Sequence, residues 1–153
     1  MKKLGKSSKK GFTLVELIVV IVILAVLAAM LVPALIGYID RARNEKDYQT
    51  ASTVYAAAQA ALTEAYAKGD IKDKASATGI ANTSKFNSVN YGDVVYDLAG
   101  VDKTKVTAFS FNATNAIISD GTVTIVNGGT TAVTYELKAD GSWGVKTESA
   151  GGN

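Results

Sequence analysis

Residues 17–36 form an uncharged apolar run, and this run limits the fold more than any other feature of the chain. It consists almost entirely of β-branched residues, leucine and alanine, with one interruption at Pro33. A helix needs about 20 such residues to cross the hydrocarbon core of a bilayer. The sequence therefore predicts a membrane-length helix near the N-terminus, and a chain of 153 residues has room for one further domain beside it.

The junction before this run joins a basic leader to a carboxylate, in the sequence Lys9-Lys10-Gly11-Phe12-Thr13-Leu14-Val15-Glu16-Leu17. A charged side chain next to hydrocarbon is costly, so Glu16 indicates a function and needs a partner. Thr13 and Glu16 also fit a capping box at a helix start, where an acid suits the helix dipole. The two roles are compatible, but the cap does not explain the Gly11-Phe12 pair.

From Lys9 to about Tyr38 the chain resembles type IV prepilins and the related pseudopilins and competence pilins. In that family a leader peptidase cuts after the glycine of this pattern and N-methylates the new first residue. The resemblance implies cleavage between Gly11 and Phe12 and methylation of Phe12. It also implies that Glu16, the fifth mature residue, forms an assembly salt bridge with the Phe12 amine of a neighbouring subunit.

Alternatives to this interpretation stay open at this stage. Glu16 lies on the first turn of its own helix, so the Phe12 amine of the same chain is a second possible partner. Either pairing is better than burying one of these charges alone. The leader and the run also fit a plain N-terminal anchor or a cleaved secretory signal, although the run is too long for an ordinary signal.

Composition fits an exported subunit without catalytic chemistry. Sixteen basic and fourteen acidic side chains give a formal charge of +2, but five of the lysines lie in the leader, so the mature chain carries about −3. No basic surface for nucleic acid survives cleavage, and the leader lysines instead keep residues 1–11 in the cytoplasm. The chain has no cysteine and therefore lacks the disulfide of many Gram-negative type IV pilins, which suits Gram-positive or anaerobic bacteria.

We expect residues 12–39 to form the transmembrane and polymerisation helix, and residues 40–68 to continue it as an amphipathic half packed on the domain. Mixed charges such as Arg43 and Asp47 mark the exit from the membrane. The face expected on the sheet consists of Tyr48, Ala51, Tyr55, Ala58, Leu62 and Ala65. Gly69 ends a helix of roughly 85 Å at 1.5 Å per residue. Pro33 and Gly37 predict a kink.

The fold class predicted is α+β, a pilin fold with the long helix on an antiparallel sheet of about four strands. Residues 69–105 are expected to be a loop-rich connection, with Tyr91–Leu98 a short helix or strand and Phe86 and Leu98 anchored on the core. The sheet occupies residues 106–148, and residues 149–153 form a flexible C-terminus. Tight hairpin turns are predicted at Asp120-Gly121 and Asp140-Gly141, with a further turn at Asn127-Gly128-Gly129.

The sequence predicts no catalytic residue, no cofactor and no metal site. It has no histidine or cysteine, and no phosphate-binding glycine-rich loop follows a strand. The acids Asp93, Asp97, Asp102 and Asp120 match no compact calcium loop and are interpreted as turn residues.

Three functions follow from these patterns. The first is a structural subunit of a surface type IV pilus for adhesion, aggregation or twitching motility; the second is a secretion pseudopilin or DNA-uptake competence pilin; the third is an anchored binding domain that never polymerises. The resemblance implies as partners other copies of the chain, the prepilin peptidase, an inner-membrane platform protein, an assembly ATPase, minor pilins and the membrane. It places the chain in the cytoplasmic membrane, with its C-terminus outside, before assembly and on the cell surface afterwards.

Overall fold

The computed structural model of the chain describes residues 11–72, 79–126 and 132–146. Its contacts divide the chain into two units, Met1–Arg43 and Asn44–Asn153. Most of the leader, the turn predicted at Asn127-Gly128-Gly129 and the C-terminal residues 149–153 lie outside the described residues.

The helix α1 runs from Leu14 to Lys68 and contains 55 residues. The helix continues without a break through Pro33 and Gly37, so the kink at these residues stays a prediction. The described residues of the first unit are exposed on every side of the helix. In the second unit the same helix turns one face inward, and every residue that α1 buries lies between Asp47 and Tyr66.

The second unit contains a five-stranded antiparallel sheet in the order β1-β4-β5-β6-β7. Its strands are β1 (Ile80–Ala81), β4 (Val106–Thr114), β5 (Ile117–Val126), β6 (Ala132–Leu137) and β7 (Trp143–Val145). The α+β class, with a long N-terminal helix and an antiparallel sheet, is confirmed. Four of the strands, β4 to β7, lie within the residues 106–148 expected for the sheet, and the fifth, β1, comes from the connecting region and pairs with β4.

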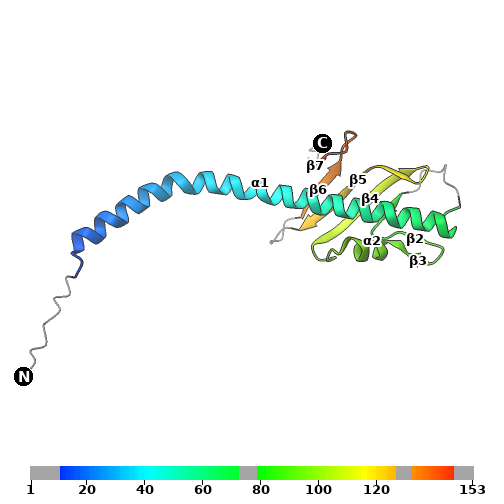
Figure 1. Cartoon of the computed structure of the whole chain (residues 1–153), viewed down its shortest axis with the longest axis horizontal. Helices are drawn as coiled ribbons and strands as arrows, with labels where there is room; N and C mark the ends of the chain where they lie inside the picture. Colours follow the sequence, from blue (N-terminus) through cyan, green and yellow to red (C-terminus); the bar gives the residue numbers. More distant parts are fainter. Residues whose placement is uncertain (1–10, 73–78, 127–131, 147–153) are drawn as a thin grey trace, which may run out of the picture. The chain divides into compact units, whose positions relative to one another are not determined.

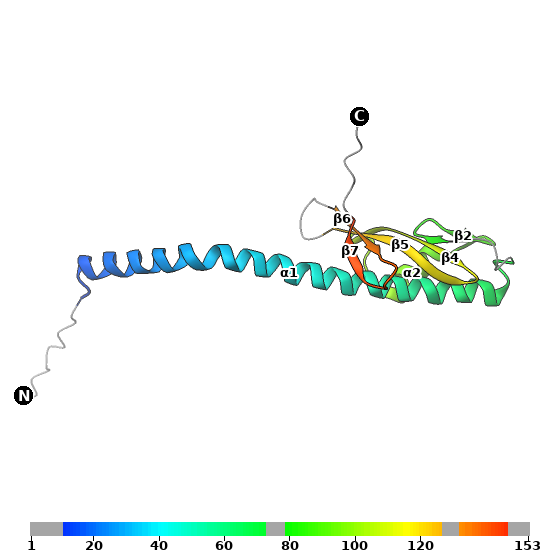
Figure 2. The same cartoon turned by 90° about the horizontal axis from the view of Figure 1, so that it is seen from above.

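The core of the second unit lies between α1 and the sheet, which run alongside each other in Figures 1 and 2. Of the helix face expected there, Ala51, Ala58, Leu62 and Ala65 are buried, whereas Tyr48 and Tyr55 are partly buried at its edge. The Tyr55 ring meets Phe111 of β4 edge-on, with 5.9 Å between centroids. Such aromatic pairs add to the stability gained from burying the rings.

The hairpin turn predicted at Asp120-Gly121 is wrong. Both residues lie inside β5, opposite Asn112 and Phe111 of β4. The chain reverses instead at Asn115 and Ala116, whose φ angles of 53° and 64° fit a two-residue hairpin turn. Gly121 is required for another reason, because a Cβ there would lie 2.2 Å from the Phe111 ring and 2.6 Å from the Ser110 carbonyl oxygen.

The second predicted turn occupies the interval between β6 and β7. Gly141 has a φ of 81°, and its N–H donates to the Lys138 carbonyl at 2.9 Å. The Asp140 carboxylate accepts hydrogen bonds from the Ser142 N–H and hydroxyl at 2.9 and 2.6 Å. These bonds hold the pKa of Asp140 below its ordinary value, with the hydroxyl contributing most.

The connecting region is more ordered than a loop. Besides β1 it contains the two-stranded sheet β2 (Lys85–Phe86) and β3 (Val89–Asn90) and the helix α2 (Tyr91–Ala99). Phe86 packs partly buried against the core, but Leu98 is 56% exposed and is not the anchor that its apolar character predicted. On α2 the inward face is Tyr91, Gly92, Val95 and Tyr96.

Candidate functional site

The candidate site is the junction from Gly11 to Glu16, where exposed backbone becomes helix. Gly11, Phe12 and Thr13 precede α1, and the Phe12 side chain is 83% exposed. A Cβ on Gly11 would meet no atom within 4 Å, and its φ lies outside the left-handed region. The fold itself therefore does not need a glycine at position 11, and the peptide bond between Gly11 and Phe12 lies open to an external enzyme.

Thr13 and Glu16 form the capping box that their spacing predicts. One carboxylate oxygen of Glu16, Oε2, accepts hydrogen bonds from the Thr13 N–H and from the Thr13 hydroxyl, both at 2.8 Å. The Glu16 N–H donates back to the Thr13 hydroxyl oxygen at 3.3 Å. Among the described residues the second carboxylate oxygen, Oε1, accepts no hydrogen bond. The cap therefore fixes the Glu16 side chain at the helix start while half of its carboxylate stays available.

The helix behind this junction is apolar and uncovered. An 18-residue window of α1 has a mean hydropathy of 3.2 and no part of it is buried, so by length and composition this helix can cross a membrane. Every large apolar side chain from Phe12 to Ile39 is at least 42% exposed. Water is an unfavourable surrounding for such a surface, which requires lipid or other protein around it.

Gly37 resembles Gly11 in that no described residue of the chain packs against the place of its missing side chain. A Cβ at this position would meet nothing within 4 Å, although glycine inside a helix costs about 1 kcal/mol relative to alanine. Small residues on membrane helices allow a second helix to approach closely. Pro33 lies one turn earlier on the same exposed segment.

Two polar side chains on α1 have structural roles that the sequence did not indicate. Asp47, interpreted as a mixed-charge residue at the membrane exit, is 1% exposed and accepts a hydrogen bond from the Tyr135 hydroxyl at 2.8 Å. Gln59 bonds to the backbone at the tip of the β4–β5 hairpin. Their partners lie more than 50 residues away along the chain, so no local pattern reveals them.

Three of the four acids considered for calcium, Asp93, Asp102 and Asp120, have hydrogen-bond partners of their own. Asp93 pairs with Lys103 and accepts from Asn90, and Asp120 accepts from Asn112 and Ser119. The Thr104 N–H donates to Asp102 at 2.7 Å and holds the pKa of that carboxyl below its ordinary value. In residues 11–72, 79–126 and 132–146, no group of three or more acidic, histidine or cysteine side chains forms a possible metal site.

Comparison with known proteins places the junction and the first part of the helix in one motif. Residues 6–32 match the family model of the prokaryotic N-terminal methylation motif. No curated protein and no solved structure matches the chain. The matched span includes Gly11, Phe12, Glu16 and most of the exposed apolar helix. The chain thus carries the class III signal peptide of type IV pilins.

Proposed function

We propose that this chain, a type IV pilin-like or pseudopilin precursor, is the structural subunit of a type IV pilus and polymerises through residues 12–39. The observation that carries the proposal is the uncovered apolar surface from Phe12 to Ile39, behind a methylation motif. Lipid covers this surface while the subunit is stored in the membrane. In the filament, the same surface is covered by the corresponding helices of other copies.

Cleavage after Gly11 converts the Phe12 amide nitrogen into an ammonium group. A filament can then pair this charge with Glu16 of a neighbouring copy. The Thr13 cap engages Oε2 of Glu16 and leaves Oε1 without a partner among the described residues, so the neighbour's ammonium can bind without breaking the cap. Because an unpaired charge in a packed apolar core is costly, this pairing favours one axial register of the subunits.

Gly37 supports the same role. No described residue of the chain lies where its side chain would be, and the missing side chain permits close approach of another helix backbone.

The test compares Glu16→Ala with Glu45→Ala, which removes another exposed carboxylate further along the same helix. We expect the Glu16 variant to be present in the membrane, cleaved before Phe12, and absent from sheared surface filaments. The Glu45 variant should assemble like the native chain. Normal filaments from Glu16→Ala would contradict the proposed pairing, and the absence of native filaments would favour an anchored domain that does not polymerise.

Two measurements test whether the chain is processed and which role it has in a filament. The mass of the N-terminal peptide from cells should correspond to a methylated Phe12, and a chain that still begins at Met1 would refute processing. The abundance of the chain in sheared filaments distinguishes the candidate roles. As the bulk component it is a pilus subunit, whereas recovery only in traces would contradict that role and favour a pseudopilin, a competence pilin or a minor subunit.

A further inference from the structure

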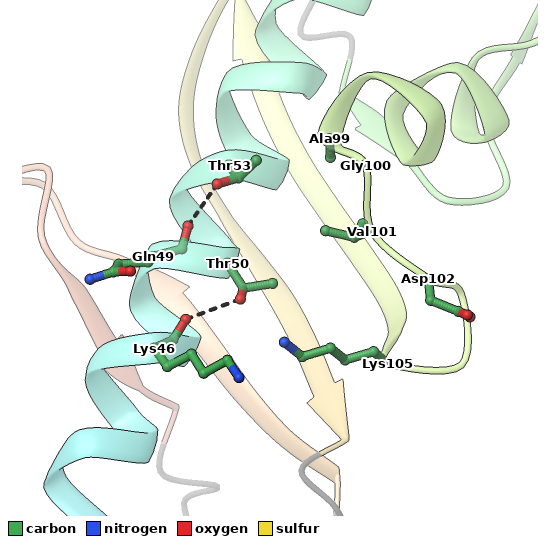
Figure 3. Close-up of a pocket in the computed structure, with 9 residues that line it drawn as sticks. All are labelled: Lys46, Gln49, Thr50, Thr53, Ala99, Gly100, Val101, Asp102 and Lys105. Atoms are coloured by element: carbon green, nitrogen blue, oxygen red, sulfur yellow. Dashed lines mark hydrogen bonds between the residues drawn. The ribbon is translucent and has the colours of Figure 1, made fainter.

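A groove of about 350 Å³ lies in the second unit, between α1 and the segment that joins α2 to β4 (Figure 3). Its lining comes from two stretches of chain: Lys46, Gln49, Thr50 and Thr53 on the helix, and Ala99, Gly100, Val101, Asp102 and Lys105 on the opposite side. Figure 3 shows the side chains of Lys46 and Lys105 extending toward one another from these two walls. One end of the groove therefore carries two ammonium groups.

Neither Lys46 nor Lys105 forms an ion pair in the part of the chain that the structure describes. The ion pairs found there join Lys68 to Glu64 and Lys103 to Asp93. The carboxylate of the groove, Asp102, accepts a hydrogen bond from the Thr104 N–H and points away from the lysines in Figure 3. Two lysines that form no ion pair at one end of a groove favour binding of an anion from outside, even though the mature chain as a whole is acidic.

The backbone fixes the position of Lys105. Its N–H donates to the Asp102 carbonyl at 3.0 Å, and its carbonyl accepts from the Val126 N–H at 2.8 Å. The Lys105 side chain is only partly exposed, whereas Lys46 is exposed and can adjust to a ligand. One ammonium group is thus held against the domain and the second can close over a bound anion.

The remaining lining of the groove mixes polar side chains on the helix with small apolar residues on the opposite wall. The hydroxyls of Thr50 and Thr53 donate to helix carbonyls at 3.0 and 2.9 Å and so are not free to donate to a ligand. Ala99 and Val101 contribute carbon atoms from the opposite wall. A ligand that fits this lining has an anionic head at the lysines and a short carbon skeleton beside Val101.

We propose that this groove binds a phosphate ester of a small polyol, with the phosphate between Lys46 and Lys105. Several phosphate oxygens can contact both ammonium groups at once, and lysine binds phosphate as a point charge. A carboxylate carries a single charge and matches two cations less well. The volume exceeds what the phosphate alone requires and leaves room for a small organic part. The proposal concerns the second unit and does not depend on filament assembly.

The test is calorimetric titration of glycerol 3-phosphate into the full chain in a non-ionic detergent at low salt. We expect saturable binding that weakens at least about tenfold in Lys46→Gln and in Lys105→Gln, because each loses a charged contact. Lys85→Gln, which removes an exposed lysine on β2 outside the groove, should bind within about twofold of the native chain. Propionate should bind at least about tenfold more weakly than the phosphate ester.

Three results would overturn the proposal: no saturable binding to the native chain, equal affinity in all three variants, or equal affinity for propionate. Fluorescence of the single tryptophan, Trp143, reports whether each variant is folded. Nanodiscs then distinguish two sources of the phosphate, and either outcome keeps the site. Weaker binding of glycerol 3-phosphate in phosphatidylglycerol than in zwitterionic discs identifies a lipid headgroup, whereas equal binding in both identifies a free ester.

Discussion

Gln59 should stabilise the second unit far more than its position on the flank of α1 suggests. Its Nε2 donates to the Ala116 carbonyl at 2.8 Å, and its Oε1 accepts from the Ile118 N–H at 2.8 Å. The two bonds hold the tip of the β4–β5 hairpin, where Ala116 has a φ of 64° that non-glycine residues rarely adopt. We therefore predict that Gln59→Met destabilises the unit, although methionine matches glutamine in length and helix propensity.

The expected magnitude follows from these contacts. A typical hydrogen bond contributes about 1 kcal/mol net, and an unsatisfied buried donor or acceptor costs about 1–3 kcal/mol. Ile118 is 4% exposed, so when the Gln59 side chain is removed, water does not readily take its place as the acceptor for the Ile118 N–H. Together the two bonds predict a loss of about 2 kcal/mol in the free energy of unfolding. For a unit of this size that corresponds to roughly 8 °C in melting temperature.

The assay is thermal and urea unfolding of the full chain in detergent, followed by the fluorescence of Trp143. Gln49→Met is the matched control, because Gln49 is exposed on the same helix and its side chain makes no hydrogen bond within the described residues. Amide exchange gives a local readout, since Ile118 should lose about 30-fold protection when the tip opens. Equal stability of the two variants within about 0.5 kcal/mol, with Ile118 protection unchanged, would refute the assigned role.

The variant Gln59→Glu tests the two hydrogen bonds separately, because its carboxyl group can accept a bond at every pH but can donate one only when it is protonated. At neutral pH the carboxylate can still accept from Ile118, but it repels the Ala116 carbonyl oxygen instead of donating to it. Protonation restores a donor, so the pKa of the new carboxyl is higher in the folded than in the unfolded chain. Its protonated form is therefore favoured by folding, and the variant should regain stability relative to native as the pH falls from 7 toward about 4.

Three further substitutions test single features of the second unit by the same unfolding measurements. Ala116→Gly should stabilise by about 0.5–1 kcal/mol, because glycine adopts the positive φ without strain; a loss of stability would contradict that backbone geometry. Gly121→Ala should destabilise by at least about 2 kcal/mol through overlap with Phe111, and a neutral effect would contradict the close approach. The pKa of Asp70 is lowered by the hydrogen bond from the Tyr91 hydroxyl at 2.6 Å and, to a smaller extent, by the one from Asn87. The ionised Asp70 side chain therefore stabilises the fold above the ordinary carboxyl pKa, and this stabilisation is lost as the pH falls through the lowered pKa. Asp70→Asn should therefore be less stable than native at pH 7 and show a smaller loss on acidification below about pH 4; equal acid sensitivity would exclude this linkage.

The sequence predicted elements whose signals are local and repeated. Charge-free residues from Leu17 to Ile36 and the three-and-four spacing beyond them gave a helix whose C-terminal residue, Lys68, agrees with the structure. The sequence also predicted a sheet of about four strands within residues 106–148, where β4 to β7 lie. β1 was missed because two residues, Ile80 and Ala81, carry no periodic signal, and it is a strand only because it pairs with β4.

The wrong turn shows where a local rule fails. Asp-Gly is a strong hairpin signal, yet Gly121 lies in mid-strand because the Phe111 ring occupies the place of its side chain. Asn115 and Ala116 form the turn, helped by Gln59 on a helix 57 residues earlier in the chain. Asp47 was misread for a similar reason, since its hydroxyl partner Tyr135 is 88 residues away.

The candidate site was easier to predict than the groove. Gly11, Phe12, Thr13 and Glu16 lie within six consecutive residues, so their chemistry is visible as a motif. Lys46 and Lys105 are brought to opposite walls of one groove only by the packing of α1 beside the segment before β4. The positions of the two lysines in the sequence do not predict that they line the same groove.

The glycines of the two units differ in whether neighbouring atoms leave room for a side chain. In the second unit, Gly92 and Gly121 are required by their own chain, because a Cβ would lie 2.1 Å from the Asn82 carbonyl oxygen in one case and 2.2 Å from the Phe111 ring in the other. In the first unit, Gly11 and Gly37 have no atom within 4 Å of that position and no positive φ. Gly37 lies inside α1 and weakens it, whereas Gly11 precedes the helix, and both glycines are explained if another molecule approaches there. The same reasoning applies to the exposed apolar side chains around Gly37, and both observations support the proposal that the first unit is recognised by a peptidase and packs in a bilayer and then against other copies.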